Sequence, residues 1–598
     1  MQAHVRTRIL AVTQADDVGD VQLIQPLWNN YGTLSRVHLV GGAYSSVIVK
    51  HIKIPHEVAH PRGFTSAISK QRKLNSYAVE THWYGHQNQR LTQKAPTPEC
   101  LDVFDEDGEL VLLLQDLGTA GFTEVLYGTS LSEVEVVLRW LAHFHAQFLG
   151  DPGEGLWTSG TYWHLQTRPE ELANIEGTVL HRFAGLLDAR LRCASFQTLV
   201  HGDAKLANFL FSEDHARVAA VDFQYVGRGC AMKDVAYFLG SCLSGDACER
   251  LSSQLLGLYF EALATYLPAR VDAAAVETEW RSVYAVAWAD FQRFMLGWSP
   301  GHRKLTAYSD STTQRAIDGI AHDLMKTAKK AALAAGHYIQ AQRNTPLDIQ
   351  SKGFDSRASD VVTQIDIEAQ RIILEILAPT ITRYDLGVLA EEGAQDDSRL
   401  TQHAFWTIDP LDGTQYFIDG KSGYATSIAL VSQSGDPILG VVYDPVHDTL
   451  FESVFGQGVT RNGIALKRLD TGSSAPTQWY ADQSLRTHPA FEQINQEFDV
   501  RFVGGAVMNA VHVLTEPQSV YIKPPKKKVG GCAIWDVAAV SLMLTELGGS
   551  ATHFDGSPLH LNRADSVYFN DVGLAFSGGA APLDTAICAI APCGGPHR

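Results

Sequence analysis

The sequence predicts two domains of mixed α and β structure: a two-lobed α+β unit, followed by a layered α/β unit. At 598 residues the chain is too long for one ordinary core, because single cores rarely exceed about 250–300 residues. A polar segment with glycine, proline and serine, residues 297–315, interrupts the chain near its middle. We therefore predict domains over residues 1–310 and 311–598, and assign the helical stretch 316–342 to the second.

Composition and charge exclude several classes of protein. With 45% hydrophobic and 19% charged residues, the chain is not mainly disordered. A net charge of −18 argues against a partner that is a nucleic-acid polymer or an anionic membrane. Eight cysteines without a CxxC pair argue against a zinc ribbon or a disulfide framework. The sequence has neither an apolar leader nor a run of 18 apolar residues, so we expect a cytoplasmic protein.

Strands come first and helices later in the first half. Residues 35–54 are typical of a strand, a glycine turn and a second strand, and residues 109–118 of a buried strand. Residues 131–150 predict a helix, in which Ser132 and Glu135 have capping-box spacing. This order indicates a small sheet lobe joined to a larger helical lobe. The apolar face expected on the helix consists of Val134, Val137, Leu138, Leu141, Phe144 and Phe148.

The second half alternates between the two kinds of element. Residues 369–379 predict a short amphipathic helix, and residues 426–432 and 437–445 predict two adjacent strands. Residues 535–549 predict a helix that ends at Gly548. Such alternation is typical of layered α and β structure.

Three polar residues of the first half form the most informative pattern there. Asp203 and Asn208 lie in VHGDAKLANFLF, and Asp222 ends the strand-like run of VAAVDF. Phosphoryl transfer from ATP needs a carboxylate near the acceptor hydroxyl and oxygen ligands for Mg²⁺. One such residue alone is more often a turn cap, so the prediction depends on the combination.

These motifs resemble the aminoglycoside phosphotransferase and choline kinase group of protein-kinase-like small-molecule kinases, and the DFQ form resembles its ecdysteroid-kinase-like branch. The likeness covers about residues 30–300. It implies a bilobal protein-kinase-like fold, ATP and Mg²⁺ as cofactors, and a hydroxylated small molecule as acceptor. Asp203 is then the catalytic base, Asn208 and Asp222 are Mg²⁺ ligands, and Asp234 is structural.

The same resemblance implies a nucleotide site in the first lobe. Lys50, at the end of a strand, would hold the α and β phosphates, and Glu80 on a helix would pair with it. Gln115 and Leu117 fall where the family contacts adenine. Residues 41–46, GGAYSS, differ from GxGxxG, so phosphate binding by their backbone is only weakly indicated.

Acidic residues of the second half lie in four separated motifs. The DPLDGT turn follows an apolar strand and can direct two carboxylates and a carbonyl at one point, which suits Mg²⁺. Taken alone, Asp536 is simply a helix cap and Glu391 part of a solvated loop. The candidate carboxylates are Asp366, Glu391, Asp409, Asp412 and Asp536.

Together the four motifs resemble the inositol monophosphatase superfamily of Mg²⁺-dependent, lithium-sensitive phosphatases, over about residues 320–580. The resemblance implies an αβαβα layered fold and a phosphomonoester substrate. Thr414 and Asp366 would activate the attacking water, and the Gly413 and Thr414 amides would hold the phosphate. The metal ligands that it implies are Glu391, Asp409, the Leu411 carbonyl, Asp412 and Asp536.

Within this superfamily, the DPLDGTQYFIDGKSGYATSIALV and PILGVVYDPV segments look closest to 3'(2'),5'-bisphosphate nucleotidases. Inositol-specific members place an acidic residue ahead of the WD motif, whereas this chain has Lys523 and residues 526–528, all lysines. A basic loop near the site would favour an acidic substrate. A solvated charged turn is an equal alternative.

One half would add a phosphate and the other remove one. We predict a bifunctional enzyme, a small-molecule kinase joined to a Mg²⁺-dependent phosphomonoesterase in one metabolic pathway. Two alternatives stay open: a regulatory switch that sets the level of one phosphometabolite, or one half that binds a ligand without catalysis. The sequence indicates neither the acceptor nor the oligomeric state.

Overall fold

A computed structural model describes residues 2–27, 30–53, 67–106, 108–343, 349–351, 361–393, 396–469, 478–516 and 518–578. The chain forms two compact units. The first unit comprises Met1–Glu176 and Arg190–Ala316, and the second comprises Gly177–Ala189 and Ile317–Arg598.

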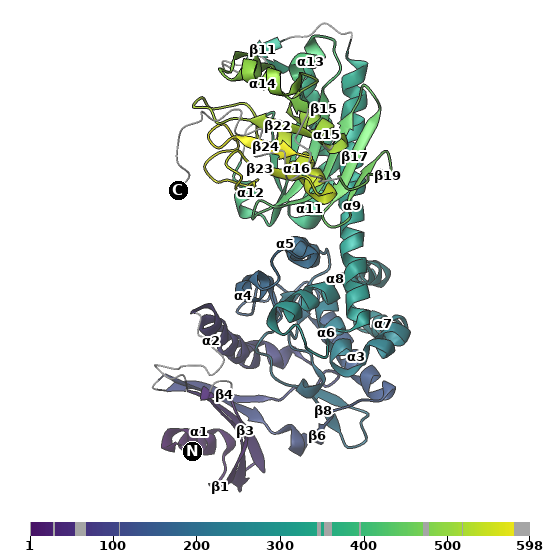
Figure 1. The fold of residues 1–598 in the computed structure, drawn as a ribbon. Coiled ribbons are helices and arrows are strands. Elements are labelled where there is room, and N and C mark those ends of the chain that lie inside the picture. The colour runs from purple at the N-terminus through teal and green to yellow at the C-terminus, as the bar shows by residue number, and fades with distance from the viewer. Residues whose placement is uncertain are drawn as a thin grey trace. The chain divides into compact units, whose positions relative to one another are not determined.

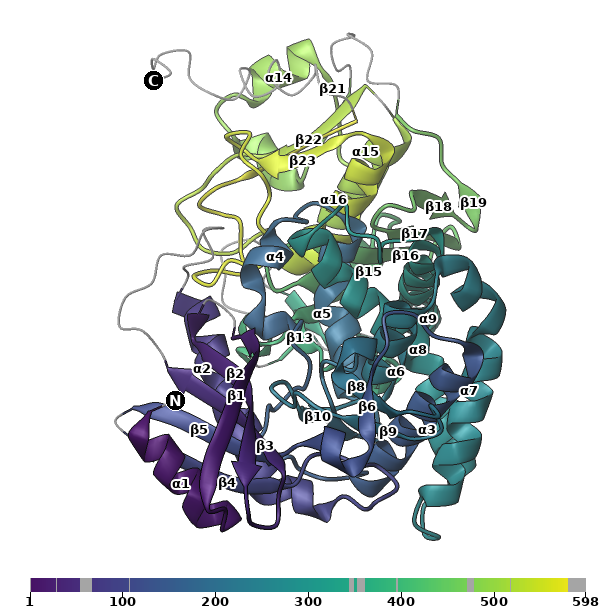
Figure 2. The same ribbon diagram turned by 90° about the horizontal axis from the view of Figure 1, so that it is seen from below.

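A five-stranded antiparallel sheet forms the first lobe of the first unit (Figure 2). Its inward-facing valines pack with Val5 and Ile9 of α1 (Ala3–Thr13), so the sheet has a small core of its own. The structure confirms the strand–turn–strand that the sequence predicts around residues 41–45. In spatial order the strands are β1 (Asp17–Pro26), β2 (Gly32–Val40), β3 (Ser46–Lys53), β5 (Glu109–Gln115) and β4 (Cys100–Glu106).

Helices dominate the rest of the first unit, with short strands that carry its polar loops. The three strands β6 (Phe122–Val125), β8 (Phe209–Ser212) and β9 (Val218–Ala220) form one small sheet, and β7 (Thr198–Val200) pairs with β10 (Gly227–Gly229). The principal helices are α2 (Ala67–His82), α3 (Leu131–Gln147), α6 (Met232–Cys242), α7 (Gly245–Tyr266) and α8 (Ala273–Trp298).

The apolar face predicted on α3 is buried as expected, but the predicted cap is wrong. The helix begins at Leu131, with Ser130 as N-cap and the backbone N–H of Ser130 donating to the Glu133 carboxylate. Ser132 and Glu135 have the same spacing two residues later. The pattern S-x-x-E therefore occurs twice, and the point at which the chain turns decides which pair caps the helix.

Two sheets with helices between them form the second unit (Figure 1). The helices α15 (Ala506–Thr515) and α16 (Ile534–Leu547) contact both sheets, and α11 (Gln364–Tyr384) contacts the larger sheet at β14. On the smaller sheet, α14 (Phe491–Glu497) contributes Ile494 to a cluster around Trp479. The described elements thus alternate between helical and sheet layers.

The larger sheet of the second unit has seven strands and the smaller sheet has five. In spatial order the larger contains β13 (Gly387–Ala390), β14 (Ala404–Asp412), β15 (Ala425–Ser432), β16 (Pro437–Asp444), β17 (Thr449–Val454), β18 (Val459–Arg461) and β19 (Ile464–Ala465). The smaller contains β21 (Asp499–Arg501), β20 (Gln478–Tyr480), β22 (Ser519–Lys523), β24 (Leu574–Ser577) and β23 (Ser550–His553).

Helix α16 is apolar on nearly all sides, as expected of a helix enclosed between layers. It approaches β16 so closely that a Cβ on Gly440 would lie 2.8 Å from the Ala539 Cα. Gly548 ends the helix with a φ of 88°, which confirms the predicted C-terminal cap.

Two helices extend beyond their predicted limits. Helix α11 continues through Pro379 to Tyr384, although we expected it to end at the proline. Helix α9 runs from Ala307 to Ala341, so the last part of the polar segment 297–315 is helical, not a linker. Polar composition alone does not stop a helix when its apolar side is packed.

None of the helices in the described part of the chain is both long enough and apolar enough to cross a membrane.

Candidate active sites

Lys50 lies between two carboxylates of the first unit, as the sequence predicts for one of them. Its Nζ is 2.7 Å from Glu80 Oε1 on α2 and 3.4 Å from Asp222 Oδ1. Burial opposes the charged ammonium, but the two carboxylates outweigh it and raise the pKa of Lys50. A fixed cation therefore lies beside Asp222, where the charge of a phosphate would be neutralised.

Asp222 has a backbone conformation that is unusual for a residue other than glycine. Its φ is 69°, two residues after the end of the short strand β9, and Gln224 Nε2 donates to its Oδ1 at 2.6 Å. Burial would raise the pKa of this carboxyl, yet Lys50, Lys205 and Lys73 lower it to about 2. Strained backbone concentrates at functional sites, and the strongly acidic carboxylate is ready to bind a cation.

Asp203 and Asn208 are brought together within one loop. Asn208 Nδ2 donates to Asp203 Oδ2 at 3.0 Å and to the Asp203 carbonyl at 2.9 Å. Lys205 Nζ lies 2.8 Å from Oδ2, and the Tyr237 hydroxyl donates to Oδ1 at 3.1 Å. Sequence reasoning missed Lys205 and Tyr237. Lys205 lies within the quoted motif, whereas nothing local marks Tyr237.

Asp234 holds this loop in place from the start of α6. It accepts the backbone N–H groups of His201 at 2.5 Å and Gly202 at 3.0 Å, and contacts His145 Nε2 at 3.2 Å. The side chain is fully buried. These contacts explain how a buried aspartate orders the loop that carries Asp203.

Gln115 and Leu117 lie at the end of β5, next to the turn between β2 and β3. The Leu117 side chain is buried against Phe122, so only its backbone could contact a nucleotide. Between the two residues, Asp116 accepts hydrogen bonds from Arg36 at 2.6 Å and from the Ser46 hydroxyl at 2.7 Å. This anchoring of the turn was not predicted, because the three residues come from separate strands and the segment after β5.

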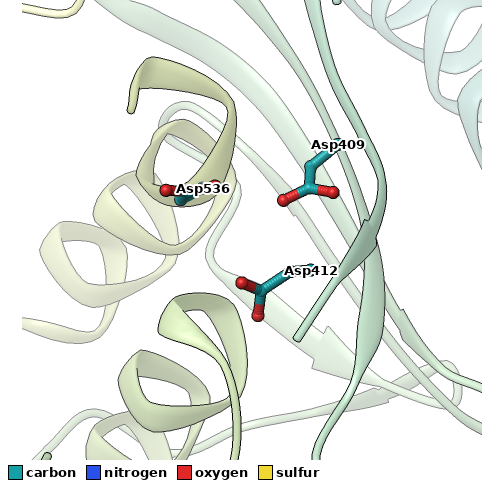
Figure 3. A group of neighbouring side chains, drawn as sticks. All are labelled: Asp409, Asp412 and Asp536. Atoms are coloured by element: carbon teal, nitrogen blue, oxygen red, sulfur yellow. The ribbon is translucent and has the colours of Figure 1, made fainter. Parts of the chain in front are cut away.

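In the second unit, the carboxylates of Asp409, Asp412 and Asp536 converge, with one oxygen from each within 4.8 Å of the others (Figure 3). Two come from the end of β14 and the third from the first turn of α16. The sequence motifs predict this convergence. Three buried carboxylates are hard oxygen donors, which fits a divalent cation such as Mg²⁺.

The three carboxylates of this group repel one another when they are ionised. Burial, together with Glu391, Asp536 and Asp412, raises the pKa of Asp409 well above its ordinary value. Burial and Asp536 raise the pKa of Asp412, and burial raises that of Asp536. A bound cation would relieve this repulsion, so the donor set fits a metal.

Backbone amides orient all three carboxylates. Asp409 Oδ1 accepts the N–H of Leu411 at 3.0 Å. Asp412 accepts the N–H groups of Ala506 at 3.0 Å and Val507 at 2.9 Å, at the start of α15. Asp536 Oδ2 accepts the N–H of Ala533 at 2.7 Å. Asp536 is therefore the helix cap that the simpler interpretation suggests, and it also lies in the carboxylate group.

The other predicted site residues lie outside this group of three carboxylates. Glu391 follows β13, which pairs in parallel with β14, and Asp366 is buried in the first turn of α11. Neither belongs to the group of three within 4.8 Å. Thr414 Oγ1 donates to the Leu411 carbonyl at 3.1 Å, and Gly413, with a φ of 80°, precedes the five-residue helix α13 (Thr414–Ile418).

One cation near the carboxylates comes from the lysine-rich segment. Lys523 Nζ on β22 lies 2.7 Å from Asp482 Oδ2, and Tyr521 and Asn509 also donate to Asp482, at 3.0 and 3.2 Å. Burial opposes its charge, but Asp482, Cys532 and Asp536 raise the pKa of Lys523. The lysines at 526–528 are exposed, so the basic loop is largely a solvated turn. Asp482 was missed because no motif marks it.

Comparison with known proteins agrees with this division. Residues 321–586 match the inositol monophosphatase family, and residues 159–269 match the ecdysteroid kinase-like family. The ecdysteroid kinase-like match includes Asp203, Asn208 and Asp222, but not Lys50 or Glu80.

Individual relatives match the second unit. The inositol-1-monophosphatase of Synechocystis sp. is 32% identical over 246 residues, 40% of this chain and 81% of that protein. The Nus factor SuhB of Xylella fastidiosa is 30% identical over 239 residues, 38% of this chain and 81% of that protein. The inositol-1-monophosphatase of Bacillus subtilis is 28% identical over 256 residues, 41% of this chain and 91% of that protein. None of the three supports the narrower likeness to bisphosphate nucleotidases, which stays a prediction. The chain belongs to the inositol monophosphatase family through its second unit, and carries an ecdysteroid kinase-like domain before it.

Proposed function

We propose that the chain is a bifunctional enzyme in which the first unit phosphorylates a small hydroxylated molecule with ATP and the second hydrolyses a phosphomonoester with Mg²⁺. The observation that carries the proposal is the gathering of carboxylates from separate segments in each unit: Glu80 and Asp222 meet at Lys50 in the first, and three buried aspartates converge in the second. Members of the inositol monophosphatase family depend on Mg²⁺, and the group of Asp409, Asp412 and Asp536 is suited to hold it.

In the first unit, Asp203 accepts the proton of the acceptor hydroxyl. The hydroxyl oxygen forms a bond to the γ-phosphorus of ATP, the bond from that phosphorus to the β–γ bridging oxygen breaks, and ADP leaves. Lys50 neutralises phosphate charge and is itself positioned by Glu80. Asn208 and Asp222 would hold Mg²⁺, which would neutralise phosphate charge. The backbone at Gln115 and Leu117 borders the adenine.

In the second unit, Asp366 and Thr414 orient an attacking water, and the Asp366 carboxylate accepts its proton. The water oxygen forms a bond to phosphorus, the ester P–O bond breaks, and the leaving alkoxide takes a proton from solvent water and departs as the alcohol. The amides of Gly413 and Thr414 hold the phosphate. Mg²⁺, when bound, would supply Lewis-acid chemistry to the reaction. Its proposed ligands are Glu391, Asp409, the Leu411 carbonyl, Asp412 and Asp536.

The phosphatase substrate that we propose carries a further acidic group. Lys523 supports this, because it is a cation held at the end of β22 by Asp482 and close enough to act on Asp536. A second phosphate, as in a nucleoside bisphosphate, would meet this charge. The exposed lysines at 526–528 add nothing specific.

Two substitutions test the proposal together. Asp203→Asn removes the base of the first unit, and Asp409→Asn removes a carboxylate of the second. Each should lower only the activity of its own unit, by about 100-fold or more, as is usual for loss of a catalytic group. The assays are phosphate transfer from labelled ATP into a metabolite extract, and hydrolysis of a panel of phosphomonoesters.

Asp246→Asn and Asp499→Asn serve as controls, because both residues are exposed and lie in the first and second unit respectively. Neither should change either activity. If Asp203→Asn and Asp409→Asn both match the wild type in both assays, the proposed function is wrong.

A further inference from the structure

An aromatic wall lies beside Asp203 in the first unit. Tyr237 is part of it and donates its hydroxyl to Asp203 Oδ1 at 3.1 Å. The ring of Tyr162 lies 5.6 Å from that of Tyr237 and 5.4 Å from that of Phe294. The rings of this cluster are buried except that of Tyr162, which is half-buried, so a molecule whose hydroxyl meets Asp203 would lie against Tyr162 at the edge of the cluster. We define the wall as Tyr162, Trp163, Tyr237, Phe291, Phe294 and Met295.

Lys304 lies over this wall. Its Nζ is 4.3 Å from the ring centroid of Tyr237 and 5.3 Å from that of Phe291. Across the described residues, no carboxylate lies within ion-pair distance of its Nζ. The neighbouring Arg303 is exposed, whereas Lys304 is half-buried.

The charge of Lys304 is poorly compensated by the protein. Burial lowers the pKa of its ammonium to about 8; Asp203 opposes this effect, and Lys205 and Arg303 add to it. Asp203 already contacts Lys205 at 2.8 Å, so its negative charge is shared. Two aromatic faces replace only part of the lost hydration of an ammonium group. A desolvated cation beside the reacting carboxylate is therefore suited to a ligand with negative charge.

We propose that Lys304 and the aromatic wall form the acceptor site of the first unit, and that the acceptor is a hydroxylated molecule with an apolar or aromatic body and an oxyanion group that Lys304 binds. The inference rests on the proposed kinase function and narrows its substrate class. It separates this chain from kinases of cationic acceptors, because Lys304 repels an amine or a quaternary ammonium group.

Three matched probes test the charge preference by equilibrium binding to the full chain, with Mg²⁺ and a non-hydrolysable ATP analogue present. They are 4-(hydroxymethyl)benzoate, the neutral 1,4-benzenedimethanol and the cationic 4-(aminomethyl)benzyl alcohol. The wild type should bind the benzoate at least about tenfold more tightly than the neutral probe, the size of one charge-assisted contact. A phosphate-bearing analogue, 4-(hydroxymethyl)phenyl phosphate, tells whether carboxylate or phosphate is preferred.

Lys304→Met keeps an apolar side chain over the rings and removes the charge, so it should abolish the preference for the anionic probes. Lys304→Arg should retain the preference. The matched control is Arg303→Gln, which removes the adjacent exposed charge and should retain the preference for the anionic probes. Equal thermal unfolding midpoints show that the variants fold.

The inference is overturned if the wild type binds neither anionic probe more tightly than the neutral one, or if Lys304→Met weakens all probes equally. A labelled product from a metabolite extract gives a second arm: a neutral or cationic acceptor overturns the inference while the kinase function stands. A different result separates the two proposals. If an anionic probe binds in a Lys304-dependent way but no labelled phosphate is transferred from ATP to any acceptor, the kinase function is contradicted and the anion-binding site at Lys304 still stands.

Discussion

Gly505 lies against the Asp412 carboxylate, and the absence of its side chain makes that contact possible. A Cβ at this position would lie 2.4 Å from Asp412 Oδ2, well inside van der Waals contact. The backbone there is ordinary, with a φ of −67°, so the requirement for glycine comes from space alone. The start of α15 thereby fixes Asp412 through Ala506 and Val507.

Gly505→Ala should displace Asp412 and reduce phosphomonoester hydrolysis by about 100-fold, the usual cost of moving a catalytic group by about an ångström. Phosphate transfer by the first unit should stay unchanged. The measurement is kcat/KM at saturating Mg²⁺. Gly319→Ala is the control, because a Cβ there meets no atom within 4 Å. If Gly505→Ala hydrolyses phosphomonoesters as fast as the wild type, the position of the Asp412 carboxylate does not matter for hydrolysis, and the prediction is wrong.

The removal of Lys50 is expected to affect both stability and activity. Lys50→Met leaves Glu80 and Asp222 without their cation, which should lower the free energy of unfolding by about 3–5 kcal/mol. Phosphate transfer from ATP should become undetectable, while hydrolysis persists. Chemical denaturation gives the free energy. Lys53→Met is the control on the same strand: its side chain is exposed, so the cost should be about 1 kcal/mol or less.

At the scale of elements, two glycines in long helices differ in the space around them: one is open and the other is tightly packed. Gly257 lies within α7, and a Cβ there would meet no atom within 4 Å. Gly297 lies near the end of α8, and a Cβ there would lie 1.8 Å from the Glu171 carbonyl oxygen. Helix propensity alone favours alanine at both positions, and packing reverses the preference at the second.

Gly257→Ala should therefore raise the free energy of unfolding by about 0.5–1 kcal/mol, because alanine loses less backbone entropy than glycine. The paired variant Gly297→Ala should lower it by about 1–3 kcal/mol through overpacking. Both values come from urea denaturation followed by circular dichroism. Stabilisation by both variants would contradict the close approach of α8 to Glu171.

At the scale of the whole molecule, each unit carries its own core and its own group of carboxylates. The carboxylates of Asp409, Asp412 and Asp536 have raised pKa values. In the absence of a cation, the folded second unit therefore binds protons more tightly than the unfolded chain. Its stability should increase as the pH falls from neutrality toward the ordinary carboxyl range, and decrease as the pH rises.

Mg²⁺ should stabilise the second unit, because it binds the folded carboxylates and not the dispersed ones. At about 100 times its dissociation constant the expected gain is about 2.7 kcal/mol. Calorimetry with Mg²⁺ or with a chelator measures the shift in the unfolding transition. Asp409→Asn should remove the shift, and Asp499→Asn should retain it. A shift of equal size in Asp409→Asn would contradict the assignment of the metal to this group.

The sequence alone determined the features that are local in the chain. The order of elements around the DPLDGT turn, the apolar face of α3 and the end of α16 at Gly548 follow from periodicity and cap residues within a few positions. The motif residues could be named for the same reason, and family resemblance supplied the expectation that separated motifs meet. Even locally, two equivalent spacings left the cap of α3 undecided until the chain path was known.

Only the tertiary structure decided which distant residues face one another. Lys304 over the aromatic wall beside Asp203, Asp482 against Lys523, and Gly505 against Asp412 all join separate elements. No spacing in the sequence encodes these pairs, because the packing of helices and strands through the core sets their distances. The burial that turns an ordinary lysine or aspartate into a binding group is likewise a property of the folded chain.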